Sequence, residues 1–185
     1  MSQPTIKALS EMFDEINEEH FNSCITKVSV QWNSRLRTCA GLCKFKRERM
    51  SINGVRQLTP TLIELSVKLF QNNDWDMDKI KNTLTHEMCH AYLLEHFNER
   101  GHTQRFQDTM TRITGIRKNH RCHNYDVEGL KNEKKYSIQC PKHGEIGKRS
   151  RAPKRGGVYR CNHCKSVITF VKLEKKSDNF WDIGD

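Results

Sequence analysis

Three segments of the chain carry apolar residues at the three- and four-residue spacing that predicts an amphipathic helix. We expect these helices over residues 4–21, from about residue 80 to residue 94, and over residues 103–114. Pro4 suits the first turn of the first helix, and Gly115 suits the C-cap of the third. The second helix follows the capping residues of "NNDWDMD", with Gly101 at or just beyond its end.

Three further segments alternate apolar and polar residues or form short apolar runs, which predicts strands. They are "KVSVQWN" at 27–33, "LRTCAGLCKF" at 36–45 and "TLIELSVKLF" at 61–70. Gly41 marks a possible bulge in the second strand. Residues 116–135 are polar and irregular, and short strand-like runs follow from Tyr136. This order predicts an α+β fold, with helices packed on a small mixed sheet and a smaller C-terminal module.

The composition narrows the class of protein. The chain has 185 residues, enough for one domain and a small module. It contains no apolar run of the roughly 20 residues that span a bilayer, and no secretory signal at its N-terminus, so we expect an intracellular protein without a membrane segment. Eight cysteines in a reducing compartment favour metal binding over a disulfide framework.

"LTHEMCHAYL" contains His86, Glu87 and His90 in the order H-E-x-x-H. On a helix the two histidines lie on one face and can hold one metal ion, while Glu87 is placed to bind a water. A catalytic zinc needs a third ligand, and His102 is preferred because a helix break lets the chain turn back. The weaker alternatives are Glu95, His96, Glu99, Asp108 and Glu128. The competing interpretation is a pair of surface histidines.

The remaining cysteines of this region have a simpler interpretation. Cys89 lies off the histidine face and is expected to pack in the core. Cys39 and Cys43 lie four residues apart in a predicted strand, which separates them by roughly 13 Å, too far for a shared metal or a disulfide. We expect both to be small buried apolar residues, unless Gly41 reverses the chain.

The C-terminal region carries a second set of metal-ligand candidates. "CPKHG" and "CNHC" combine a C-x2-H pair with a C-x2-C pair, a pattern typical of a structural zinc ribbon. His163 is expected to face outward, and the alternative is a loose basic tail with a reactive thiol pair. The expected zinc ligands are Cys140, His143, Cys161 and Cys164.

The net charge of +10 is concentrated in this region. Residues 131–176 hold fourteen lysines and arginines but only three acidic residues, a balance that suits a polyanionic partner such as nucleic acid. A merely solvated surface is an equally open alternative for such a charge run. Exposed cations would contact phosphates, and an exposed aromatic ring would stack on unpaired bases. Tyr159 is the preferred candidate for this ring, and Tyr136 and Phe170 are the alternatives. The expected DNA contacts are Lys148, Arg149, Arg151, Lys154, Arg155, Tyr159 and Arg160.

Several motifs together resemble the SprT-like metallopeptidase family over residues 6–173. "VQWNSRLRTCAGLC", "LTHEMCHAYL" and "GHTQRF" resemble segments of the Spartan proteases, and "RCHNYD", "EIGKRS" and "CNHC" resemble the germ cell nuclear acidic peptidases. The resemblance implies a zincin-like metallopeptidase core over residues 1–120, and a linker and DNA-binding zinc ribbon over residues 121–174. A flexible tail is expected over residues 175–185. By motif it makes His86, His90 and His102 the catalytic zinc ligands and Glu87 the general base.

The resemblance also implies a function. It predicts a DNA-dependent endopeptidase with two zinc ions that cleaves proteins crosslinked to DNA, itself included. We expect a monomer that binds single-stranded or junction DNA, in the nucleus on chromatin and secondarily in the cytoplasm. His143 departs from the usual ribbon cysteine, and no segments for ubiquitin, sliding-clamp or segregase binding are recognised. The alternatives are a general zinc peptidase localised by its basic tail and a DNA-binding zinc protein without protease activity. A zinc nuclease or deaminase is disfavoured, because deaminases pair H-x-E with P-C-x-x-C.

Overall fold

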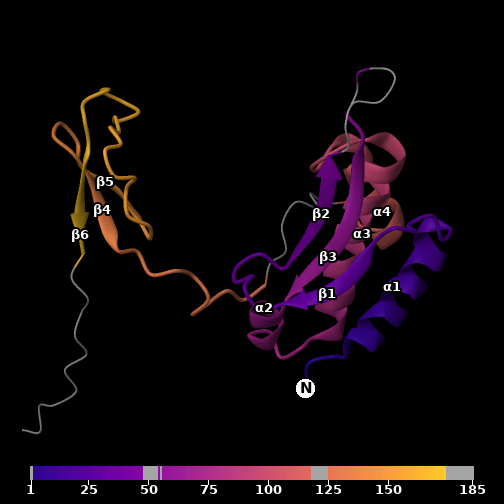
Figure 1. Cartoon of the computed structure of the whole chain (residues 1–185). Coiled ribbons are helices and arrows are strands. Elements are labelled where there is room, and N and C mark those ends of the chain that lie inside the picture. The colour runs from indigo at the N-terminus through magenta and orange to yellow at the C-terminus, as the bar shows by residue number, and fades with distance from the viewer. Residues whose placement is uncertain (1, 48–53, 55, 118–124, 174–185) are drawn as a thin grey trace, which may run out of the picture. The chain divides into compact units, whose positions relative to one another are not determined.

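The computed structural model describes residues 2–47, 54, 56–117 and 125–173 (Figure 1). The chain forms two compact units, Met1–Lys131 and Asn132–Asp185, which we call unit 1 and unit 2. The first unit extends past residue 120, the boundary expected from sequence, because Tyr125, Val127 and Leu130 pack against its core. The expected tail, residues 175–185, lies wholly outside the described part of the chain.

Unit 1 is an α+β unit built on a small mixed sheet. Its elements in chain order are α1 (Ile6–Phe21), β1 (Ser29–Asn33), β2 (Gly41–Arg47), β3 (Leu58–Ser66), α2 (Val67–Gln71), α3 (Met77–Phe97) and α4 (Gln104–Thr114). Strand β3 lies at the centre of the sheet, parallel to β1 on one side and antiparallel to β2 on the other. Helix α3 packs against β3 and β2, while α1 packs against β1 and α3, and α4 against α3 (Figure 1).

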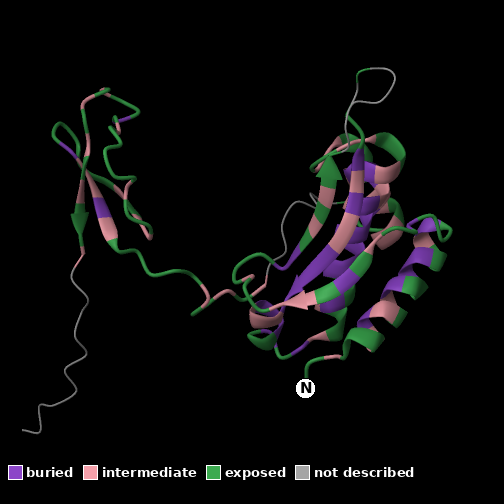
Figure 2. Ribbon diagram, viewed as in Figure 1, coloured by how far each residue is buried: buried purple, intermediate pink, exposed green. Residues whose placement is uncertain are grey.

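The core of unit 1 lies between the sheet and α3. Buried side chains follow β3 and the length of α3, as the purple segments of Figure 2 show. Burial of each large aliphatic side chain contributes about 1.5–3 kcal/mol, so this interface fixes α3 firmly on the sheet. Its fully buried members include Ile63, Leu65, Ile80, Leu84 and Met88.

The two helices that flank the histidines have well-defined ends. The Asp76 side chain accepts hydrogen bonds from the first backbone N–H groups of α3, and Asn98 ends this helix in a left-handed conformation. Thr103 caps α4 at its start and Gly115 at its end, as expected for Gly115. The short connection between Asn98 and Thr103 therefore has little freedom, and it contains His102.

The N-terminal helix starts later than its apolar spacing predicted. The Thr5 side chain accepts a hydrogen bond from the Ala8 N–H and caps α1, so Pro4 lies outside the helix. Ile6 is 59% exposed, and the buried face is instead Leu9, Phe13, Ile16 and Phe21.

All three predicted strands have different bounds, and the first begins at Ser29 and not at residue 27. The second begins at Gly41 and not at residue 36, and its register shift lies between Lys44 and Phe45 and not at Gly41. The third ends at Ser66, whose hydroxyl accepts the Leu69 N–H and starts α2, so the β-branched Val67 is helical. Local propensity favoured a longer strand, but the cap decides the boundary.

Unit 2 is a small antiparallel sheet. It consists of β4 (Tyr136–Cys140), β5 (Gly144–Arg149) and β6 (Thr169–Lys172), in the order β5-β4-β6. The strand-like runs predicted from Tyr136 onward are confirmed. No helix in the described part of the chain is long and apolar enough to cross a bilayer.

Candidate metal centres

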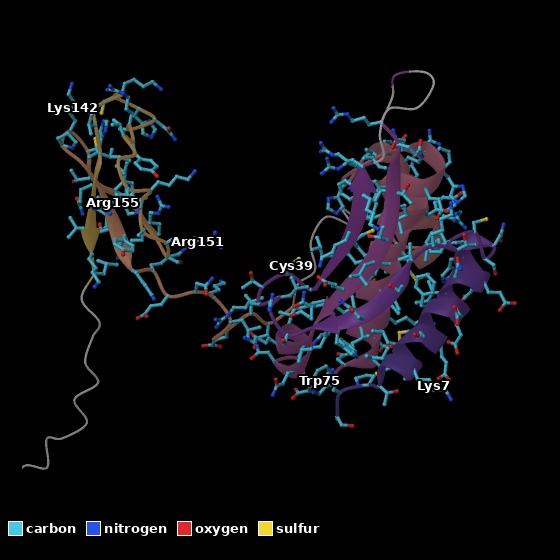
Figure 3. All side chains as sticks on the ribbon, viewed as in Figure 1. Lys7, Cys39, Trp75, Lys142, Arg151 and Arg155 are labelled. Carbon is cyan, nitrogen blue, oxygen red and sulfur yellow. The ribbon has the colours of Figure 1, made fainter. Side chains whose placement is uncertain are left out.

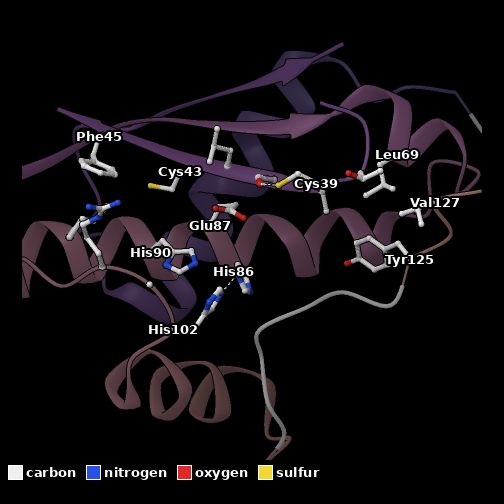
Figure 4. Close-up of a pocket in the computed structure, with 17 residues that line it drawn as sticks. Cys39, Cys43, Phe45, Leu69, His86, Glu87, His90, His102, Tyr125 and Val127 are labelled. Carbon is white, nitrogen blue, oxygen red and sulfur yellow. Dashed lines mark hydrogen bonds between the residues drawn. The ribbon is translucent and has the colours of Figure 1, made fainter. Parts of the chain in front are cut away.

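Three histidines of unit 1 converge on one point. His86 and His90 lie one turn apart on α3, and His102 reaches them from the α3–α4 connection (Figure 4). One ring nitrogen from each can be chosen so that all lie within 4.8 Å of one another, and the Nε2 atoms of His86 and His102 are 3.1 Å apart. Nitrogens on a tetrahedral zinc lie about 3.3 Å apart at the usual Zn–N distance. The donor set and its spacing are therefore compatible with zinc.

The alternative third ligands have other partners or lie outside the cluster. Glu99 accepts hydrogen bonds from Thr103 and Arg105, and Asp108 accepts one from Gln104. Only His102 joins His86 and His90 in a metal-binding group of the described residues. The structure brings together the three histidines that the sequence singled out.

Phe106 of α4 holds the imidazole rings in place. It is fully buried, stacks on His90 at 4.4 Å between ring centroids, and meets His86 and His102 edge-on. Burial, together with the proximity of His102, lowers the pKa of His90 to about 4. His90 is therefore neutral at physiological pH, the form in which imidazole binds a metal.

Glu87 is buried beside the histidines. It is 7% exposed, and Figure 4 shows its carboxylate between β2 and α3. Burial raises its pKa to about 7, against the lowering effect of a hydrogen bond from the Cys43 backbone N–H. A carboxyl group that titrates near neutral pH is suited to taking up and releasing a proton.

Gly41 makes the position of Glu87 possible. A Cβ atom at Gly41 would lie 2.7 Å from Glu87 Cγ and 2.9 Å from Thr83 Cγ2, closer than real Cβ contacts. The residue is thus required for the close approach of β2 to α3. The sequence suggested a bulge at this glycine, and no local pattern reveals the contact with α3.

The site opens into a cavity of about 600 Å³. Its wall includes edge strand β2, the three histidines, and Tyr125 and Val127 from the segment after α4. Tyr125 donates a hydrogen bond to the Lys79 carbonyl, and its hydroxyl lies 3.0 Å from the Thr83 hydroxyl. Sequence reasoning placed this segment in an irregular polar region, although its apolar positions Tyr125, Val127 and Leu130 were a usable signal.

The expected burial of the cysteines near the site is confirmed for Cys89 but not for Cys39. Cys89 is fully buried, as expected. Cys39 lies before β2 and is exposed, so its predicted burial was wrong, and Cys43 is half-buried. Both line the cavity, and the Cys39 thiol donates to the Gly41 carbonyl. The distance expected between Cys39 and Cys43 assumed that both lie in one strand, and it does not apply because Cys39 lies outside β2.

Unit 2 contains a second group of metal ligands. The Sγ atoms of Cys140 and Cys161 lie 3.4 and 3.6 Å from His143 Nδ1, and those of Cys140 and Cys164 lie 3.5 Å apart. A tetrahedral zinc with these donors requires about 3.5 Å between S and N and about 3.8 Å between S atoms, whereas a disulfide requires about 2.05 Å. The group therefore fits a zinc ion, and His143 belongs to it. His163 is exposed and outside the group.

The basic residues of unit 2 fall into two sets. Arg149 lies over the rings of Tyr159 and Phe170, which pack against each other, and the Tyr159 hydroxyl accepts the Lys154 N–H. Arg149, Tyr159 and Phe170 form a half-buried cluster, which leaves Tyr159 less free to stack on a base than the sequence suggested. Figure 3 labels two of the remaining expected contacts, Arg151 and Arg155. All of the remaining contacts are exposed: Lys148, Arg151, Lys154, Arg155 and Arg160.

Comparison with known proteins shows the class to which this fold and site belong. The SprT-like family profile matches residues 9–127, and the chain belongs to this family, as its motifs indicated. It is 30% identical to the germ cell nuclear acidic protein of Drosophila melanogaster over 91% of this chain and 15% of that protein. It is 31% identical to the human DNA-dependent metalloprotease SPRTN over 58% of this chain and 20% of that protein. Protein SprT of Pseudomonas fluorescens is 27% identical over 76% of this chain and 94% of its own length.

The chain thus spans less than a third of the length of each of its two germ cell relatives. The matched part of the Drosophila protein is 15% of its length, and that of the Caenorhabditis elegans germ cell nuclear acidic-1 protein is 28%. The human relative named as a metalloprotease matches 58% of this chain, whereas the two germ cell proteins match 91% and 80% of it.

Proposed function

We propose that the chain is a DNA-dependent zinc metalloendopeptidase that cleaves proteins crosslinked to DNA, including copies of itself. The observation that carries the proposal is the convergence of His86, His90 and His102 beside the buried Glu87 at an open cavity. The similarity to a relative named as a DNA-dependent metalloprotease supports it. Unit 2 supports it as well, because it combines a zinc-compatible group with exposed cations.

The residues of unit 1 would divide the reaction between them. His86, His90 and His102 would hold a zinc ion, which when bound acts as a Lewis acid that polarises the scissile carbonyl and lowers the pKa of the attacking water. Glu87 takes the proton from this water and passes it to the leaving amine. The Cys43 N–H and the contact with Gly41 hold the carboxylate in place for both transfers.

Strand β2 offers a place for the substrate backbone. It is an edge of the sheet, and its residues Gly41, Leu42, Cys43 and Phe45 line the cavity. An extended peptide can align along a strand edge through main-chain hydrogen bonds, which do not depend on side-chain identity. Such binding fits a peptidase that must accept many different crosslinked proteins.

The second zinc ion would be structural. Cys140, His143, Cys161 and Cys164 close the coordination sphere with four protein ligands, which leaves no position for water. Unit 2 would then present its exposed cations to single-stranded or junction DNA, with the protein as a monomer on nuclear chromatin. A relative named germ cell nuclear acidic protein supports the nuclear location.

Cleavage of a DNA-binding protein with and without single-stranded DNA tests the proposal. We expect fragments only with DNA, and a charge-reversed variant of Arg151, Lys154 and Arg155 should lose this stimulation while it keeps both zinc ions. Equal cleavage with and without DNA would instead identify a general zinc peptidase. DNA binding without any cleavage by the zinc-loaded protein would identify a non-enzymatic DNA-binding protein.

A further inference from the structure

One end of unit 1 gathers cations from three separate elements. Lys46 and Arg47 end strand β2, Arg56 lies two residues before β3, and Arg100 lies just after α3. We call Lys46, Arg47, Arg56 and Arg100 the basic end. All four are exposed, and none forms a salt bridge with a described residue.

The fold fixes these cations beside one another. Arg47 pairs with Leu58 across the β2–β3 ladder. The Asn98 side chain accepts the Leu58 N–H at 2.9 Å and donates to the Arg56 carbonyl at 3.1 Å, which ties the end of α3 to the start of β3. Two residues further on, the Arg100 guanidinium lies 4.7 Å from the centre of the Phe45 ring.

The basic end adjoins the metal centre. Phe45 and Arg100 line the same cavity as His90 and His102. The acidic residue nearest in sequence to Arg100, Glu99, is engaged by Arg105 and Thr103 and does not neutralise the basic end. The segment from residue 44 to residue 56 contains two lysines and three arginines but only one acidic residue.

We propose that the basic end is a second nucleic-acid contact, on the catalytic unit itself, that holds the phosphate backbone of a crosslinked DNA strand at the rim of the cavity. This inference rests on the proposed function and adds to it a contact separate from unit 2. A protein crosslinked to DNA brings a charged strand to within a few residues of the peptide bond to be cut. Cations at the rim therefore lower the cost of placing that strand there.

Nucleic acid fits the basic end better than an acidic peptide does. Arginine binds phosphate through two parallel hydrogen bonds, and three of the four cations are arginines. The Phe45 ring holds the Arg100 guanidinium in place beside the cavity through a cation–π contact. Phosphate contacts carry no sequence preference, which suits a peptidase that acts wherever a crosslink forms.

Binding of fluorescent single-stranded DNA to the full chain, over a range of salt concentrations, tests the inference. The variant Lys46→Gln, Arg47→Gln, Arg56→Gln removes three cations that do not line the cavity and leaves Arg100 in place. If each cation neutralises one phosphate, the slope of log K against log salt should become less steep by about 2. Affinity near 0.1 M salt should fall on the order of tenfold or more.

Two controls separate this contact from the other charges of unit 1 and from the peptidase activity. The variant Lys7→Gln, Lys68→Gln, Lys81→Gln removes the same charge elsewhere on unit 1 and should leave the slope unchanged. With saturating single-stranded DNA present, the basic-end variant should cleave an uncrosslinked peptide at the wild-type rate but a DNA-crosslinked protein more slowly. The inference would be overturned if the basic-end variant kept the wild-type slope. It would also be overturned if polyglutamate displaced the fluorescent DNA as well as unlabelled DNA does. The proposed function fails separately, if the wild-type chain cleaves neither substrate.

Discussion

Gly41 and Glu87 approach so closely that a methyl group on Gly41 would lie 2.7 Å from Glu87 Cγ and 3.0 Å from its Oε1. Gly41→Ala must therefore displace the Glu87 side chain or push β2 away from α3. We expect kcat/KM to fall on the order of 100-fold, the typical effect of misplacing a reacting group by about 1 Å. Zinc content should stay at the wild-type level, because the three atoms nearest to a Cβ at Gly41 belong to Glu87 and Thr83 and not to a histidine.

Peptidase kinetics and metal analysis of Gly41→Ala check this expectation. Ser29→Ala, at an exposed position of β1 in the same sheet, is the matched control and should retain full activity. A Gly41→Ala variant as active as the wild type would show that the close approach does not matter for catalysis.

His102 is the proposed third ligand of the catalytic zinc. His102→Ala should reduce the zinc content from two ions per chain to about one, because a two-histidine site binds zinc much more weakly. Glu99→Ala is the control, since Glu99 was an alternative ligand but accepts hydrogen bonds from Arg105 and Thr103. Metal analysis after gel filtration distinguishes the two. Retention of two ions by His102→Ala and loss of one by Glu99→Ala would reverse the assignment.

The structural zinc should control unit 2 alone. Unit 2 has few apolar residues to bury, so loss of a ligand in Cys161→Ser should unfold it, as happens in small zinc domains without metal. Unit 1 has its own core and should stay folded. Amide NMR spectra should therefore lose the signals of residues 136–172 and keep those of α3. His143→Cys should remain folded, because a thiolate can replace the imidazole as ligand.

Glu64 links stability to pH. It is 3% exposed, and burial alone would raise its pKa, but hydrogen bonds from Lys44, Asn33 and Gln31 hold the pKa below its usual value. Because the folded-state pKa is lowered, the resulting stability is present above the unfolded value near 4.5. It is lost as the pH falls through the lower folded-state pKa.

Glu64→Gln should therefore destabilise unit 1 at pH 7 by about 1.5–3 kcal/mol, and by less in acid. Urea unfolding followed by the fluorescence of Trp32 and Trp75, which pack edge-to-face in unit 1, measures this difference. The difference in unfolding free energy between the wild type and Glu64→Gln should be smaller at pH 3 than at pH 7. An equal difference at the two pH values would contradict the role assigned to the carboxylate.

The sequence predicted the two clusters of candidate metal ligands better than it predicted the rest of the site. His86 and His90 share a helix face because helical spacing is local, and the break before Thr103 made His102 a reasonable third ligand. The ribbon ligands followed from the spacing of Cys140, His143, Cys161 and Cys164. Such patterns can be recognised in the sequence because each pair of ligands is close together in the chain.

The contacts that complete the site depend on residues far apart in the chain. Gly41 and Glu87 meet across two elements, and Tyr125 reaches Lys79 and Thr83 from beyond α4. Because β2 begins at Gly41, Cys39 lies outside the strand and is exposed, although burial was predicted. Tertiary packing, and not local propensity, decided each of these features.

Cleavage of a protein covalently crosslinked to single-stranded DNA, by the wild type and by Glu87→Gln with metal content measured on the same samples, tests the central claim most directly. We expect the wild type to shorten the crosslinked protein, and Glu87→Gln to retain two zinc ions and DNA binding but to leave the crosslink intact. Cleavage by Glu87→Gln at the wild-type rate, or an intact crosslink after treatment with zinc-loaded wild type, would contradict the account.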